Sequence, residues 1–306
     1  MSAKKRSPDD SSSATRSATS GPVRRWLLVT TVILLAGGGG AYAIWNQVRD
    51  HVLAGAEYQL DPEKIVVSPQ PEWIRSDVRA EVLEQANFDG KLSLLDPELT
   101  LRLASAFATH PWVAHVERVS KRFPAGVEVV LSYRKPVAMV EVRGGALPVD
   151  FEGVVLPSGD FTAEEAEHYP RIDEIHTAPG GEVGSRWGDV AVVGAAQIAA
   201  VLATDWQTLG LARIVPAGRR PARSGYEYEY TLFTKAGTRV DWGRAPGTDS
   251  PGETSAADKL ARLREYVAQN NSLDGTGGPQ RMRFLDSGQL SVERRTPVKS
   301  LPKAEQ

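Results

Sequence analysis

A run of residues without a single charge, from Trp26 to Val48, constrains this chain more than any other feature of its sequence. As a helix rising ~1.5 Å per residue, its Trp26–Trp45 part reaches roughly 30 Å, which is the thickness of a bilayer core. Trp26, Tyr42 and Trp45 stand near its ends, where aromatic rings favour the headgroup layer. We therefore predict a transmembrane helix over residues 26–48, with Trp26 and Trp45 marking its ends.

A cleaved secretory leader is the alternative, because Ala41-Tyr42-Ala43 has the small-x-small form of a signal-peptidase site. Leaders are usually cut within their first ~15–30 residues, after an apolar stretch of ~7–15. Here residues 1–25 already form a polar tail with more basic than acidic side chains. A tail with so few large apolar residues is expected to be disordered, and its basic excess places it in the cytoplasm. A retained, single-pass anchor with an extracytoplasmic C-terminal part is favoured.

Composition excludes several classes of function. The net charge of -2 gives no general attraction for nucleic acid, and the absence of cysteine excludes disulfides, Cys-ligated zinc and thiol catalysis. None of the five histidines falls in a His-Glu-x-x-His or comparable metal-binding spacing, and the sequence has neither a Gly-x-Ser-x-Gly elbow nor a phosphate-binding glycine loop. We expect a chain that is not an enzyme, with no metal, no cofactor, no small-molecule substrate and no nucleic-acid partner.

Beyond the span, apolar periodicity predicts strands and helices in the order β-α-α-β-β, because i, i+4 patterns alternate with period-two patterns. The expected elements are a strand at 64–68, a helix with Ile74, Val78 and Val82 on one face, a helix that begins at Asp96 and buries Leu99, Leu103 and Phe107, and strands at 112–120 and 126–133.

Further along the chain, strand patterns dominate. Short strands divided by glycine turns are expected over residues 137–156, and a helix over 195–203. A hairpin should follow, which places Tyr226, Tyr228 and Tyr230 on one face and returns through Val240 and Trp242. A helix over 258–268 and one last strand over 281–292 complete the expected order. The predicted fold class is α+β: a transmembrane helix, a β-α-α-β-β domain, and a mainly antiparallel β domain with flanking helices.

Four stretches are similar to a known family. "HPWVAHVERVSKRFPAGVEVVLSYRKPVAMVEV", residues 110–142, resembles the junction between the POTRA and β domains of the FtsQ/DivIB bacterial cell-division proteins. "PVDFEGVVLP", residues 148–157, is similar to the family's Val-Asp-x-x-Gly-Val turn, and "GTRVDWGR" with "KLARLREYV" is similar to its strand-Gly-x-x-x-x-Lys-Leu passage. Two features depart from the family pattern: the usual glycine is missing at Ser68-Pro69-Gln70, and the Asp-x-Arg of the last strand is Asp286-Ser287-Gly288.

This resemblance covers roughly residues 65–292 and implies a domain plan. The plan is a disordered cytoplasmic tail at 1–25, the transmembrane helix at 26–48, a linker at 49–63, a POTRA domain at 64–135, an FtsQ-type β domain at 136–292 and a disordered tail at 293–306. The implied function is a non-enzymatic scaffold of the septal peptidoglycan machinery, located in the inner membrane at the division septum. Its implied partners are small bitopic coiled-coil division proteins and other membrane proteins of the divisome.

The resemblance also implies two partner-binding regions. The residues on the strand after Pro-Trp that would contact a recruiting partner are His115, Val119 and Lys121, although Val119 also fits an ordinary core position. We expect the final strand to be the docking edge for a partner segment, with Arg283, Phe284, Leu285, Gln289 and Ser291 as its contact residues; the alternative is a strand that only completes the sheet. Gln289 and Ser291 are expected at its exposed, outward-facing end, where proline would remove a main-chain bond to an added strand.

Two other functions remain open from the sequence. One is a POTRA-type carrier or assembly factor for protein translocation, which would require a transmembrane barrel with repeated ~10-residue alternating strands. The other is a membrane-anchored extracytoplasmic hydrolase, which would require a convergent set of catalytic groups.

Overall fold

The computed structural model describes residues 22–53, 58–88, 92–222, 225–248, 253–276, 278–285 and 288–294. The chain divides into two compact units, Met1–Gln59 and Leu60–Gln306. Most of each tail predicted to be disordered lies outside the described residues, at 1–21 and 295–306, and so do Asp286 and Ser287. The predicted bounds are wrong at their inner ends, because residues 22–25 already belong to a helix and residues 293–294 to a strand.

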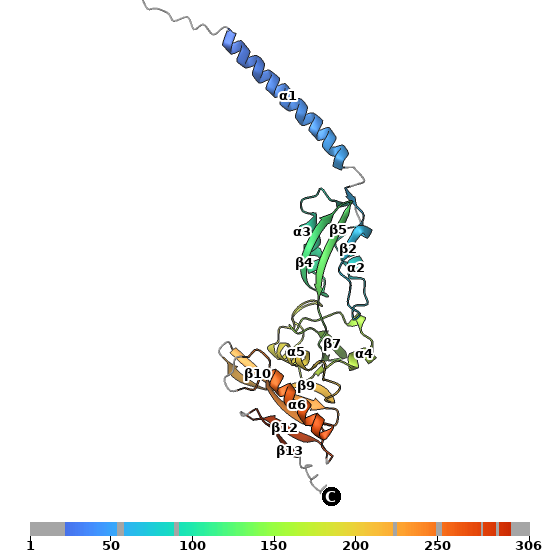
Figure 1. Cartoon of the computed structure of the whole chain (residues 1–306), viewed down its shortest axis with the longest axis vertical. Helices are drawn as coiled ribbons and strands as arrows, with labels where there is room; N and C mark the ends of the chain where they lie inside the picture. The colour runs from blue at the N-terminus through green and yellow to red at the C-terminus, as the bar shows by residue number, and fades with distance from the viewer. Residues whose placement is uncertain are drawn as a thin grey trace, which may run out of the picture. The chain divides into compact units, whose positions relative to one another are not determined.

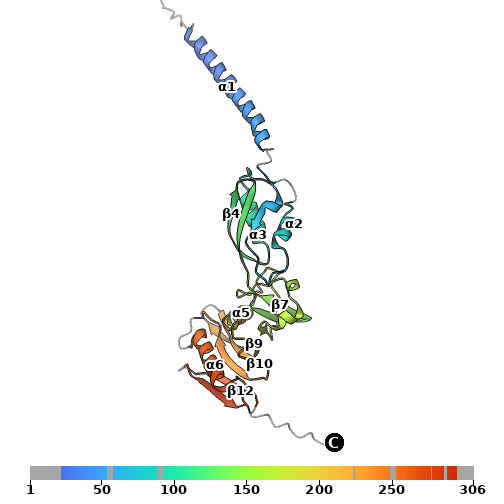
Figure 2. The same cartoon turned by 45° about the vertical axis from the view of Figure 1, so that its right-hand side comes forward.

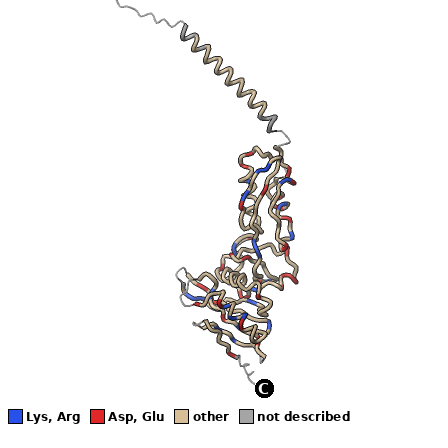
Figure 3. The backbone as a smooth tube through the Cα atoms, viewed as in Figure 1, with Lys and Arg blue, Asp and Glu red and all other residues tan. Residues whose placement is uncertain are grey.

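The first unit contains one long helix, α1 (Pro22–Leu53). Its Val29–Val48 stretch is the one part of the described chain that is long and apolar enough to cross a membrane, although a signal sequence passes the same test. Figure 3 shows this stretch without acidic or basic residues, whereas both kinds are interspersed along the second unit. The hydroxyl groups of Thr30 and Thr31 donate to carbonyls of the preceding turn, so neither is left unpaired in an apolar environment. The predicted linker begins as helix, because α1 continues to Leu53.

The second unit begins with a three-stranded sheet and two helices (Figure 1). Along the chain these elements are β2 (Ile65–Val67), α2 (Val78–Gln85), α3 (Leu99–Ala108), β4 (Val113–Arg122) and β5 (Gly126–Tyr133), with the short β1 (Gln59–Leu60), η1 (Pro62–Lys64) and β3 (Leu92–Ser93) between them. The sheet order is β2-β5-β4: β2 runs parallel to the central strand β5, and β4 runs antiparallel to it. One hydrophobic core joins the helices to the sheet.

The two helices start later than their sequence patterns suggest. Asp77 caps α2 by accepting from the Ala80 amide at 3.0 Å, so Ile74 precedes the helix although its side chain is still buried in the core. Asp96 accepts a hydrogen bond from the amide of Glu98. It therefore stabilises the turn that precedes α3 and does not cap the first turn of the helix. The expected buried face of α3 is confirmed, because Leu99, Leu103 and Phe107 are fully buried.

An eight-stranded sheet follows, in the order β13-β12-β11-β10-β9-β8-β6-β7. Its strands are β6 (Ala138–Val142), β7 (Gly145–Val149), β8 (Arg171–Ile172), β9 (Leu211–Ala222), β10 (Gly225–Thr234), β11 (Arg239–Arg244), β12 (Gln280–Phe284) and β13 (Leu290–Arg294). The sheet is mainly antiparallel, as expected, but it also contains three short parallel pairings: β6 with β8, β8 with β9, and β11 with β12. The β8–β9 and β11–β12 connections carry helices, as parallel crossovers usually do. The α+β class is thus confirmed.

The crossover helices are α5 (Val190–Leu202) and α6 (Ala256–Asn270), and the shorter η2 (Ser158–Asp160) and α4 (Ala163–Glu167) follow β7 (Figure 2). Buried residues of α5 and α6 join those of the central strands in a second core. Gly194 of α5 leaves room for Tyr230, since a Cβ there would lie 2.1 Å from the tyrosine oxygen. That hydroxyl donates to the carbonyl of Ala191 at 3.0 Å, and burial raises its pKa.

The end of the sheet differs from the sequence prediction. The single strand expected at 281–292 is a hairpin of two strands, β12 and β13, which pair antiparallel through five residue pairs. Gly288, at φ +74°, lies in the connection between them, in a region of backbone conformation that favours glycine. As a result, β13 and not β12 forms the edge of the sheet.

Candidate functional site

The first predicted partner region lies on β4, an edge strand of the three-stranded sheet. His115 is exposed, whereas Val119 is only partly exposed and packs against the core. Two register shifts interrupt the pairing of β4 with β5, and such irregularities hinder the addition of a further strand. If this region binds a partner, side chains rather than backbone groups would form the contact.

Lys121 has a structural role that its sequence position does not reveal. Its ammonium group donates to the backbone carbonyls of Leu94 and Asp96, at 2.6 and 2.5 Å, in the turn that leads into α3. A carboxylate at this position would face two carbonyl oxygens, so we expect Lys121→Glu to lower the melting temperature although residue 121 is exposed.

The second predicted region is divided between two strands. Arg283 and Phe284 lie on β12, and Ser291 lies on β13 opposite Arg283. Phe284 is half-buried and its ring meets the Trp242 ring edge-on at 6.1 Å, so it belongs in part to the core. Leu285 is 43% exposed. The expected contact residues are therefore close together, but they do not form one outer edge.

The hydrogen-bond pattern of the hairpin shows which amide groups of β13 point outward. The Leu285 amide donates to the Gln289 carbonyl at 2.9 Å. Bonded and non-bonded pairs alternate along an antiparallel ladder, so Ser291 is in the next bonded pair and turns its amide toward β12. Gln289 and Ser291 are consequently the wrong positions for a test of strand addition. The amide groups of Leu290 and Val292 point to the open edge of the sheet.

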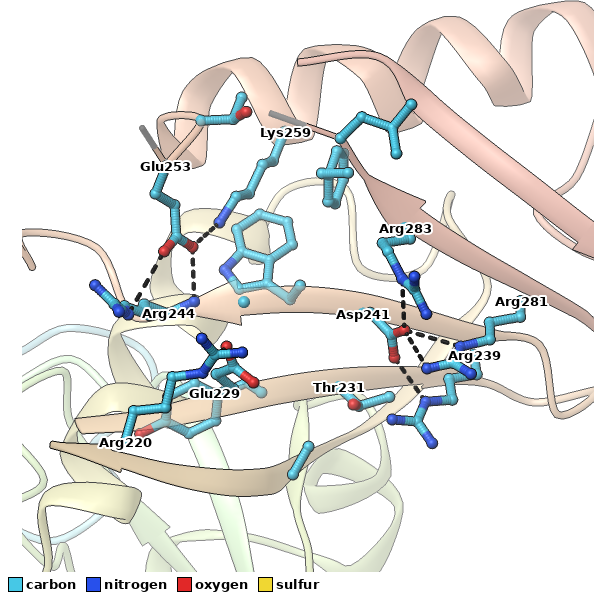
Figure 4. Close-up of a pocket in the computed structure, with 17 residues that line it drawn as sticks. Arg220, Glu229, Thr231, Arg239, Asp241, Arg244, Glu253, Lys259, Arg281 and Arg283 are labelled. Atoms are coloured by element: carbon cyan, nitrogen blue, oxygen red, sulfur yellow. Dashed lines mark hydrogen bonds and ion pairs between the residues drawn. The ribbon is translucent and has the colours of Figure 1, made fainter. Parts of the chain in front are cut away.

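Charged side chains line a cavity of about 640 Å³ beside β10, β11, β12 and α6 (Figure 4). On its right in the figure, Asp241 accepts hydrogen bonds from the guanidinium groups of Arg239 at 2.7 Å and Arg281 at 2.9 Å. The guanidinium of Arg283 forms a longer ion pair with it, at 3.7 Å. Burial opposes the charge on Asp241, but the hydrogen bonds from Arg239 and Arg281 outweigh it and hold the pKa of this carboxyl below its usual value.

A second charge group lies on the left of the cavity in Figure 4. Glu253 accepts from the buried ammonium of Lys259 at 2.5 Å and from the amide of Arg244 at 2.8 Å. The Lys259 ammonium also lies 5.3 Å from the centre of the Trp242 ring. The indole nitrogen of Trp242 is buried and has no hydrogen-bond partner among the described residues.

Sequence reasoning did not find this arginine-lined cavity, although it singled out Arg283. The signal was the alternation of Arg239 with Asp241 and of Arg281 with Arg283, which puts each pair on one face of its strand. The pairing of the two strands, which brings the four side chains together, is not readable from the sequence.

Within the described ranges, no group of three or more His, Asp or Glu side chains is placed to hold a metal ion. Buried His110 accepts from the Trp112 amide and contacts Glu81 at 3.0 Å.

No protein-family model matches the chain, and no curated protein matches it either.

Proposed function

We propose that this chain is a bitopic membrane scaffold of the bacterial cell-division machinery, of the FtsQ/DivIB type. In this proposal α1 is a retained anchor with a cytoplasmic N-terminus, residues 64–135 form a POTRA domain and residues 136–292 form the β domain. The chain would act without catalysis, by binding other division proteins outside the cytoplasm and coupling their assembly to septal peptidoglycan synthesis.

The observation that carries the proposal is the order β2-α2-α3-β4-β5 followed along the chain by a mixed sheet with an open edge strand. This order agrees with the POTRA pattern implied by residues 110–142. The position of both sheets after an apolar helix agrees with the topology of the family.

The edge at β13 suits the addition of a partner strand. It pairs with β12 over five residue pairs without a register shift, and Val292 is 37% exposed. A regular, uncovered edge can accept an extended segment through backbone hydrogen bonds, while alternate side chains provide specificity. Small bitopic coiled-coil division proteins are the proposed partners there, and the exposed face of β4 is the proposed contact for an upstream recruiter.

Val292→Pro tests the docking edge. Proline has no amide hydrogen, so this variant removes an outward donor without removing a bond to β12. We expect it to remain folded by circular dichroism, to lose co-purification of the small bitopic proteins from solubilised membranes, and to lose their recruitment to the septum. Val292→Ala, which keeps the amide, is the matched control and should retain both. Normal co-purification with a folded Val292→Pro variant would exclude this edge.

Topology is tested separately. A reporter that is active only outside the cytoplasm should work when fused after Gln306 and fail when fused before Trp26, because the basic excess precedes the span. N-terminal sequencing that finds a mature start at Ile44 would instead identify a cleaved leader.

A further inference from the structure

The arginine cluster around Asp241 has more positive charge than its one carboxylate can neutralise. Three guanidinium groups meet one carboxylate, which leaves a surplus of two positive charges. The side chains of Arg239, Arg281 and Arg283 remain 38%, 41% and 53% exposed, so each keeps donors that are free to meet a ligand.

The pairing of the strands makes this arrangement unfavourable without a counter-ion. Arg239 lies directly opposite Arg281 in the ladder between β11 and β12, and Asp241 lies opposite Arg283. Like charges that face each other across two strands destabilise a sheet. Asp241 offsets only part of this repulsion.

The donors also converge. The guanidinium groups of Arg281 and Arg283 both reach the same oxygen, Oδ2 of Asp241, from neighbouring positions on one face of β12. Figure 4 shows the three arginines directed toward this one point at the cavity. Convergent guanidinium donors suit a compact oxyanion with several charges, since each planar fork can bind two oxygens. An extended acidic segment would instead spread its charges along its length.

From this geometry we propose that Arg239, Arg281 and Arg283 form a binding site for a multivalent oxyanion of the phosphate class, such as a pyrophosphate group. The adjoining cavity of about 640 Å³ provides space for a ligand larger than a single phosphate. The phosphate belongs either to a soluble ligand or to an anionic lipid headgroup. The inference does not rest on the proposed scaffold role, because it concerns the purified chain without any division partner.

Calorimetric titration of the full-length chain, in a zwitterionic detergent, with inorganic pyrophosphate tests the site. We expect saturable binding that weakens as salt is added. Arg281→Gln and Arg283→Gln should each lower the affinity by about tenfold or more, as the loss of charged hydrogen bonds predicts. Arg186→Gln is the matched control, because Arg186 is also an exposed arginine paired with a carboxylate, and it should bind as the wild type does.

Asp241→Asn should change the affinity for pyrophosphate in the opposite direction. The carboxylate competes with the anion for the same donors, so its neutralisation should raise the affinity, an effect that general loss of structure would not produce. Circular dichroism checks the fold. If Asp241→Asn does not fold, Arg283→Gln still tests the site. Arg283 makes the longest of the three contacts with Asp241, at 3.7 Å, so its replacement should disturb the fold least.

Reconstitution in vesicles distinguishes the two sources of phosphate. Pyrophosphate binding that is weaker in vesicles of phosphatidylcholine with phosphatidylglycerol than in phosphatidylcholine alone would identify a lipid headgroup, and equal binding would identify a soluble ligand. Absence of pyrophosphate binding to the folded wild type, or equal binding to both arginine variants and the wild type, would overturn the proposal. Tighter binding of polyglutamate through the same arginines would also overturn it, in favour of an acidic protein segment.

Discussion

The two sheets of the second unit differ in how their buried polar groups are hydrogen-bonded, and two tryptophans show the contrast. Trp112, beside the three-stranded sheet, and Trp242, in the eight-stranded sheet, are both almost completely buried. The Trp112 indole donates to Asp160 at 2.6 Å, and Asp160 accepts further bonds from the amides of Arg75 and Ser76. The Trp242 indole has no such partner in the described part of the chain.

The same contrast extends to the cations. Lys121 of the smaller sheet uses its ammonium group on two backbone carbonyls, whereas the arginines of the larger sheet share a single carboxylate. Satisfied polar groups rigidify a structure, and unsatisfied ones retain the capacity to bind something else. The polar groups named here are satisfied at the smaller sheet, whereas those on the cavity side of the larger sheet keep the capacity for binding that we propose above.

The largest effect is expected from Asp160→Ala. This change leaves four donors without their acceptor: the indole of Trp112, the amides of Arg75 and Ser76, and the Ser76 hydroxyl. We expect a loss of about 3–5 kcal/mol in the free energy of unfolding, measured by chemical denaturation followed by circular dichroism. A loss below about 1 kcal/mol would show that water replaces this acceptor, and the contrast between the sheets would then be weaker than described.

Replacing each tryptophan by phenylalanine compares the two sites directly. Both substitutions remove the same part of the ring, so the difference between them reports the hydrogen bond. Trp112→Phe should destabilise the chain by about 1–3 kcal/mol more than Trp242→Phe, because only the first breaks a bond to a buried carboxylate. Equal losses in parallel denaturation curves would mean that the bond to Asp160 contributes nothing.

Removing one cation from each sheet gives a smaller difference. Lys121→Met keeps the aliphatic stem but loses the two bonds to Leu94 and Asp96, so we expect a loss of about 1–2 kcal/mol. Arg283→Gln should change stability by no more than about 0.5 kcal/mol, since exposed substitutions usually have small effects. Thermal unfolding of both variants checks the order, and a larger loss from Arg283→Gln would give the arginine cluster a structural role.

The smallest effect concerns pH. Because the pKa of Asp241 is lower in the folded chain than its ordinary value of 3.8, its ionised form stabilises the fold above that value. This contribution is lost as the pH falls below 3.8 through the folded pKa. Denaturation midpoints recorded from neutral to acidic pH should therefore fall more steeply for the wild type than for Asp241→Asn. Parallel curves would contradict the assigned role of the arginines in holding the charge.

Local patterns predicted the smaller sheet better than the larger one. The buried faces of α3 and the bounds of β5 follow from periodicity alone, because those residues alternate regularly against one core. Strand β9 was missed, since Pro216, Gly218 and Pro221 interrupt it, and these residues usually break a strand pattern. The bonds of Lys121 and the arginine cluster could not be predicted either, because they join residues that are distant in sequence.

The ladder between β11 and β12 is where a pull on the C-terminal hairpin would act. Only three residue pairs join these parallel strands, whereas five join β12 to β13. If a partner strand binds β13, as proposed above, a pull on that partner would load this ladder, and Asp241, which contacts Arg281 and Arg283 of β12 from β11, lies across it. We expect the ion pairs of the arginine cluster to add to the mechanical strength of this attachment.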